Sequence, residues 1–213
     1  MLSSSIPAPS SPAHGISVLG MGAVLGLWFG VVAVASHAGS FVTEAGQPPL
    51  ALLIAVTLPI LLFAVAYLAF EPFRRFVREG DPVLLTNVQS WRILGGTFVV
   101  LLSFGLLPAT FALPAGLGDM AIGITAPFIA RLVGTPFRWR PLFAVWQVLG
   151  ILDLVVAVGT GAGTRAFPQL GGGPVNGELM IVMSQLPLSL IPTFAVPLFI
   201  ILHLASLAQV RAS

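Results

Sequence analysis

The chain has 213 residues, of which 57% are hydrophobic and only 8% are charged, and its formal net charge is +2. A typical soluble domain has about 25% charged residues, so a soluble fold of this size is excluded and lipid must be the solvent. The sequence contains no cysteine and no lysine. Disulfides, thiolate metal sites, cysteine nucleophiles, Schiff-base lysines and Walker lysines are therefore excluded as well.

The first residues are rich in Ser, Pro and Ala and lack the positive region of a signal peptide. We expect 1–15 to be a disordered tail, 16–208 a single transmembrane domain and 209–213 a short C-terminal tail. Six apolar segments approach the roughly 20 residues that cross a bilayer: they are 16–36, 50–70, 91–113, 116–133, 142–161 and 178–207. The predicted fold class is all-α, a polytopic membrane protein with a bundle of six transmembrane helices.

Arginine placement decides the number of spans, because the fourth segment is short and is bounded by Asp119 and Arg131. The arginines in question follow the second, fourth and sixth segments: they are Arg74, Arg75, Arg78, Arg131, Arg138, Arg140 and Arg211. Six spans put all of them on one side, as the positive-inside rule requires, whereas five spans would divide the two main clusters. We therefore expect a multi-pass protein of the cell inner membrane with both termini in the cytoplasm.

A glycine recurs at every fourth position of the first segment, at Gly22, Gly26 and Gly30. Such a face lets another helix approach closely, and it predicts helix packing within the chain, in a homo-oligomer or against a partner in a membrane complex. Membrane lipids are the other expected partners. We expect no nucleic acid, because the arginines lie between apolar spans rather than on one soluble face.

Asp153 is the most informative single residue, because it lies deep in the fifth segment, about 18 Å along the helix from its cytoplasmic end. A carboxylate at that depth is costly unless it is protonated, paired or hydrated. It indicates either a proton, cation or acid/base site, or a hydrogen-bonded acid that pins two helices together. Gln89 and Arg92, at the inner start of the third segment, are expected to cap that helix or to snorkel.

Asp119 and Glu178 open the fourth and sixth segments on the outer side. Either each acid complements its helix dipole, or both join Asp153 around an outward-facing polar cavity. Gln185 shares a helix face with Glu178, and His37 lies at the outer end of the first segment. These residue types suit a divalent cation, but no fixed metal spacing is present, so we predict no metal site and no cofactor.

The sixth segment contains Pro187, Pro192 and Pro197, each of which removes a backbone donor and bends the helix. Broken helices near a polar site are typical of transporters, although prolines are also common in membrane helices generally. His203 is expected to be a hydrogen-bonded residue rather than a haem ligand, since His37 lies on the opposite side of the membrane.

Two pairs of similar sequence indicate a duplication: 91–95 resembles 146–150, and 118–122 resembles 177–181. Either helices three and four duplicate helices five and six as a hairpin, or the likeness is chance within an apolar alphabet.

Three functions stay open, and no catalytic residue is assigned. The favoured one is transport of a small solute, ion or proton through an outward-facing acidic cavity around Asp153, Asp119 and Glu178. The second is a membrane-embedded enzyme that uses paired carboxylates for acid/base chemistry on a lipid or isoprenoid substrate. The third is a non-catalytic subunit of a larger membrane complex.

Overall fold

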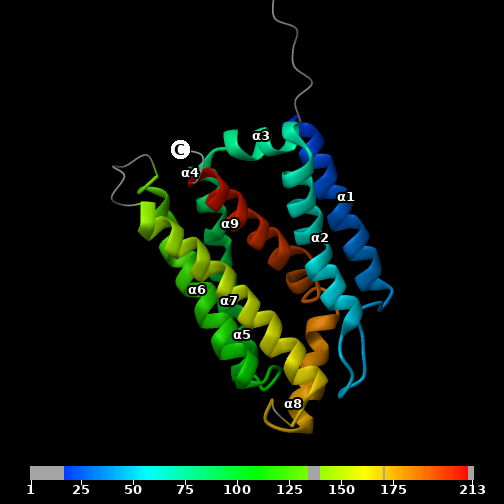
Figure 1. Ribbon diagram of the computed structural model, residues 1–213. Helices are drawn as coiled ribbons and strands as arrows, with labels where there is room; N and C mark the ends of the chain where they lie inside the picture. The colour runs from blue at the N-terminus through cyan, green and yellow to red at the C-terminus, as the bar shows by residue number, and fades with distance from the viewer. Residues whose placement is uncertain (1–16, 134–139, 170, 211–213) are drawn as a thin grey trace, which may run out of the picture.

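The computed structural model describes residues 17–133, 140–169 and 171–210, and every regular element in them is a helix. Most of the two predicted tails lies outside these residues, as do Arg138 and Arg211. The long helices run side by side, with α3 (Glu71–Glu79) across one end of the bundle and α8 (Pro174–Leu179) at the other (Figure 1).

In the described part of the chain, five helices are long and apolar enough to cross a membrane. They are α1 (Val18–His37), α2 (Leu50–Ala69), α6 (Ala109–Ala130), α7 (Arg140–Ala166) and the run Ile191–Gln209. Many of their large apolar side chains are exposed, which is stable only where lipid surrounds them. The predicted count of six spanning helices is not confirmed.

The third predicted segment is divided differently from the expectation. Three short elements follow one another without a break: α4 (Pro82–Val88), the 3-10 helix η1 (Gln89–Gly95) and α5 (Gly96–Ser103). The predicted single helix over 91–113 is therefore wrong, because it starts inside this run and extends past its end.

A glycine ends α5 and a proline begins α6. Gly105 has a φ of 68°, and the N–H groups of Gly105 and Leu106 donate to the carbonyls of Leu102 and Leu101, which is the Schellman arrangement. Pro108 then has extended backbone and directly precedes α6. The predicted boundary near residue 116 is therefore wrong as well, and the fourth helix is longer than expected.

The sixth predicted segment is broken rather than merely bent. After α8 come the 3-10 helix η3 (Met180–Ser184), a turn, a π-helical turn η4 (Ile191–Ala195) and α9 (Val196–Val210). Side chains around the break satisfy freed polar groups, since the Thr193 hydroxyl donates to the Ser189 carbonyl (2.6 Å) and the Ser189 hydroxyl donates to Ser36 (2.9 Å).

A duplicated hairpin is not confirmed. Residues 91–95 form most of η1, whereas 146–150 lie inside the long helix α7. Likewise 118–122 lie in the middle of α6, whereas 177–181 span the junction of α8 and η3. The similar sequences therefore occupy different structural contexts.

Arginines gather at one end of the bundle. Arg74, Arg75 and Arg78 lie on α3, and the end of α6 and the start of α7, which carry Arg131 and Arg140, lie at the same end (Figure 1); we call this the arginine-rich end. The Arg74 Nε–H donates to the Glu71 carboxylate at 2.8 Å, which lowers the pKa of Glu71. α3 combines these charged residues with apolar ones, so it is amphipathic, as is typical of a helix that lies at a membrane surface.

The glycine face of α1 makes no close contact with the other described helices. A Cβ atom placed on Gly22, Gly26 or Gly30 would meet nothing within 4 Å among the described residues. Packing within the chain is therefore wrong for this face, and an intermolecular partner stays a prediction.

Candidate functional site

A buried arginine lies at the centre of the bundle, on η1. The side chain of Arg92 is 0% exposed, and its Nε–H donates to Asp119 Oδ1 at 2.7 Å. One terminal nitrogen donates to Asp153, and the other donates to the Gly150 carbonyl at 3.1 Å and lies 3.2 Å from His203 Nε2. We call Arg92, Asp119, Asp153, His203 and Gln147, which contacts His203, the Arg92 cluster.

Glycines on three elements make room for the Arg92 cluster. A Cβ on Gly118 would lie 1.7 Å from Asp153 Oδ1, and one on Gly95 would lie 2.3 Å from the Cβ of Asp119. A Cβ on Gly150 would lie 2.3 Å from His203 Nε2. The charged side chains can therefore meet only because these three positions have no side chain.

The hydrogen bonds of His203 define its protonation. An arginine only donates, so His203 Nε2 accepts from Arg92 and its Nδ1–H donates to the Gln147 side-chain oxygen. The imidazole is therefore neutral. Trp146 packs against its ring with centroids 5.5 Å apart, and the indole N–H donates to Thr125 at 2.9 Å.

The Arg92 cluster has more acid than base. One guanidinium faces two carboxylates, and the imidazole is neutral, so the cluster carries a net negative charge when both acids are ionised. An excess charge in a low-dielectric interior is costly. One proton or one monovalent cation would cancel it.

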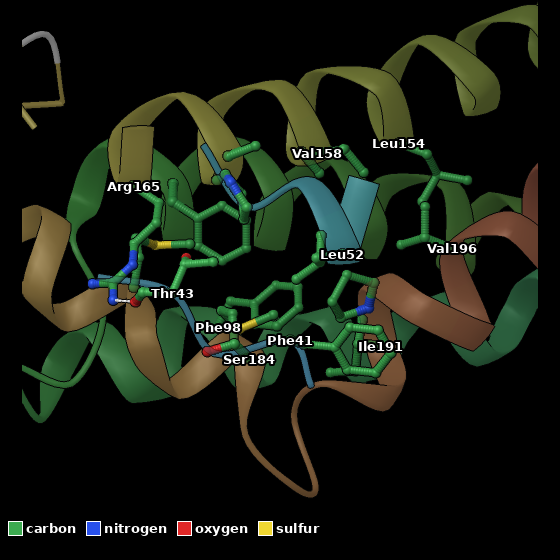
Figure 2. A pocket seen from close by; sticks show the side chains of 18 of the residues that line it. Phe41, Thr43, Leu52, Phe98, Leu154, Val158, Arg165, Ser184, Ile191 and Val196 are labelled. Atoms are coloured by element: carbon green, nitrogen blue, oxygen red, sulfur yellow. Dashed lines mark hydrogen bonds between the residues drawn. The ribbon is translucent and has the colours of Figure 1, made fainter. Parts of the chain in front are cut away.

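Asp119 also belongs to the wall of a cavity with a volume of about 60 Å³, which has room for a few water molecules or a small ligand. Several elements form the wall of the cavity: the loop before α2, the helices α2, α5, α6 and α7, and the broken sixth segment. Figure 2 shows Arg165 and Thr43 at one end and Leu154 and Val196 at the other. Apart from a few polar groups, its lining is apolar.

The structure brings together two of the five predicted site residues. Asp119 and Asp153 meet at Arg92, whereas His37, Glu178 and Gln185 are exposed and do not line the cavity. The predicted shared face of Glu178 and Gln185 is wrong, because the helix ends between them. The helix-dipole explanation for Asp119 is also wrong, because Asp119 lies in the middle of α6.

Sequence reasoning missed the role of Arg92. The expectation that Arg92 and Gln89 cap a helix or snorkel is wrong, since both are buried. The available signal was a charged residue immediately before the apolar run 93–102. The neighbouring residues, however, did not indicate that the Arg92 side chain faces the interior of the bundle. Among the described residues, no group of three or more His, Cys, Asp or Glu side chains is arranged to hold a metal ion.

Comparison with known proteins gives a family without an assigned activity. No curated protein matches the chain, and no solved structure matches it. One family matches residues 49–211, from the residue before α2 to the end of α9 and just beyond. The matched region contains the Arg92 cluster and most of the cavity lining, and it leaves out α1. The chain therefore belongs to the family described as "Domain of unknown function (DUF8737)".

Proposed function

We propose that this protein is a transporter that moves a small solute across a membrane together with a proton. The observation that carries the proposal is the double position of Asp119, which lines the cavity and also pairs with the buried Arg92. A solute in the cavity can therefore contact Asp119, which belongs to the Arg92 cluster and its excess of negative charge. Binding of a proton and binding of a solute can then influence each other.

The proton site comprises both carboxylates. Asp119 exchanges a proton with the cavity, while Asp153 and Arg92 hold the charge when the proton leaves. The network continues toward the arginine-rich end, because Gln147 precedes Asp153 on α7 by about 9 Å of helix. The Gln89 oxygen and the Gln147 nitrogen are buried and have no hydrogen-bond partner among the residues that the structure describes, and such groups bind internal water.

The proposal includes a topology. We infer that the continuous run of α4, η1 and α5 is a sixth crossing, which gives six crossings and puts both termini on one side. By the positive-inside rule the arginine-rich end faces the cytoplasm of the cell, so the cavity faces outward across the inner membrane. The middle of this run carries Arg92, whose charge is paired with Asp119 and Asp153.

The broken sixth segment supplies a movable part. The turn between η3 and η4 lies beside the cavity, and Ser184, Ile191 and Pro192 line it. Broken helices with solute sites beside them are a recurrent feature of secondary transporters. A rearrangement at this turn would change access to the cavity without disturbing α6 and α7.

Proteoliposomes that contain a pH-sensitive dye test the proposal. They are given one solute class at a time: carboxylates, amines, amino acids, sugars and alkali cations. We expect one class to change the internal pH in wild-type vesicles, and we expect Asp119→Asn and Asp153→Asn to abolish that change. Glu178→Gln, which neutralises an exposed acid, is the matched control and should behave as wild type.

Gel filtration and circular dichroism confirm that each variant is folded. If no solute class changes the internal pH, or if the folded Asp→Asn variants transport like wild type, the proposal fails. Turnover of a lipid or isoprenoid substrate in detergent, without any gradient, would instead favour an enzyme. Co-purification of an otherwise inert chain with another membrane protein would favour a complex subunit.

A further inference from the structure

Arg165 is a second buried cation, distant from the Arg92 cluster. It lies in the last turn of α7, is 5% exposed and lines the cavity. Its guanidinium donates to the Gly177 carbonyl at 2.6 Å and to the Thr43 carbonyl (Figure 2). These bonds use two of the five N–H donors of an arginine.

No acidic side chain among the described residues neutralises the charge of Arg165. In the part of the chain that the structure describes, Arg165 forms no ion pair. Glu44 and Glu178 directly follow Thr43 and Gly177, yet the side chains of both acids are exposed and do not reach it. Carbonyl oxygens satisfy hydrogen bonds without supplying a negative charge, and an unpaired buried charge is costly. The site is therefore suited to an anion.

The cavity beyond Arg165 suits hydrocarbon. Its walls include Phe41, Leu52, Phe98 and Val158, and it ends at Leu154 and Val196 (Figure 2). Transfer of a ligand methylene from water to such an apolar wall is favourable by about 0.8 kcal/mol of free energy. A volume of about 60 Å³ limits the length of the ligand to a short chain.

We infer that the cavity binds a small organic anion, a carboxylate with a short hydrocarbon tail, with the carboxylate at Arg165 and the tail toward Leu154. The inference rests on the proposed function for its role as the transported substrate, but binding can be measured without transport. Uptake of one carboxylate with one proton on the Asp119 and Asp153 pair would be electroneutral. The O–H bond of the carried proton forms on one side of the membrane and breaks on the other, and the carboxylate itself crosses chemically unchanged.

Thermal unfolding of the purified protein in detergent, followed by tryptophan fluorescence, measures binding. Butyrate, hexanoate and octanoate are compared with alcohols and amines of the same chain lengths. We expect the carboxylates to raise the Tm in a saturable manner, and the alcohols and amines to have little effect. Equal shifts from the alcohols would overturn the assignment of an anion site.

Two kinds of variant locate the site. Arg165→Gln should weaken carboxylate binding by about 30-fold or more, since a buried charge pair is lost, whereas Arg131→Gln, at an exposed arginine of the opposite end, should not change it. Because Arg165 also holds the loop at Thr43, Ala157→Leu provides a second test that leaves the arginine in place. It narrows the cavity and should weaken hexanoate binding more than butyrate binding.

Unchanged binding in folded Arg165→Gln, or an equal effect of Ala157→Leu on both chain lengths, would overturn the inference. Nanodiscs with and without phosphatidylglycerol separate a soluble carboxylate from a lipid headgroup. If only the anionic lipid raises the Tm through Arg165, a soluble carboxylate is ruled out. Carboxylate binding without any solute-driven pH change in vesicles would support the anion site and refute transport, so the two proposals fail separately.

Discussion

Replacing Gly118 with alanine tests whether the close approach of α6 to Asp153 holds the bundle together. The new Cβ would lie 1.7 Å from Asp153 Oδ1 and 2.6 Å from its Cγ, so the carboxylate must retreat by about 1 Å or more. That movement separates Asp153 from Arg92, to which it is hydrogen-bonded. The substitution therefore weakens the ion pair between Arg92 and Asp153 without changing any charge.

The expected magnitude follows from three terms. Loss of a hydrogen bond to a charged group costs about 1.5–3 kcal/mol, and a fully broken buried pair costs about 3–5 kcal/mol. Alanine improves helix propensity by at most about 1 kcal/mol relative to glycine. We expect Gly118→Ala to lower the free energy of unfolding by about 1–3 kcal/mol, because the carboxylate can rotate and keep part of its contact.

Equilibrium unfolding with SDS in mixed micelles, followed by far-ultraviolet circular dichroism, measures this difference. Gly26→Ala is the matched control, since its Cβ meets nothing within 4 Å. In an Asp153→Ala background, Gly118→Ala should no longer lower the free energy of unfolding, because the carboxylate that clashes with the new Cβ is absent. If Gly118→Ala and Gly26→Ala differ by less than about 0.5 kcal/mol, the close approach does not constrain the ion pair.

Two further predictions concern the ends of the bundle and the face of α1. The Gln209 side chain donates to the carbonyls of Val77 (2.8 Å) and Gly80 (2.9 Å), so Gln209→Leu should speed amide hydrogen exchange in α3 while α6 stays protected; unchanged exchange in α3 would contradict this. Gly26→Leu should leave the free energy of unfolding within about 0.5 kcal/mol but weaken self-association in analytical ultracentrifugation. A loss of stability without a change in mass would show that the face packs within the chain.

Local hydropathy was enough to predict several helices. The predicted segments 16–36, 50–70 and 142–161 correspond to α1, α2 and α7, with boundaries that differ by at most five residues. A helix that faces lipid must be apolar along its whole length, so an uninterrupted apolar stretch of sequence predicts where it begins and ends.

Helix ends were less predictable where two signals competed. We placed a boundary near residue 116 and interpreted Asp119 as an acid in the first turn of a helix, but α5 ends at Ser103, just before Gly105, and α6 begins after Pro108. Pro114 is tolerated inside α6. The Gly105 and Pro108 pair was the better signal, since glycine provides the positive φ that a Schellman motif needs.

The sequence alone indicated that Asp153 needs a partner, because the cost of a buried carboxylate depends only on its depth in an apolar segment. It did not identify that partner. Arg92 is 61 residues earlier in the chain, and its inward direction results from the packing of η1 against α6, where glycines allow backbones to approach. The position of Arg165 at a cavity formed by segments distant in sequence was likewise decided only by the tertiary structure. Depth in the membrane is a local property of the sequence, whereas the partners of a buried charge depend on which helices meet.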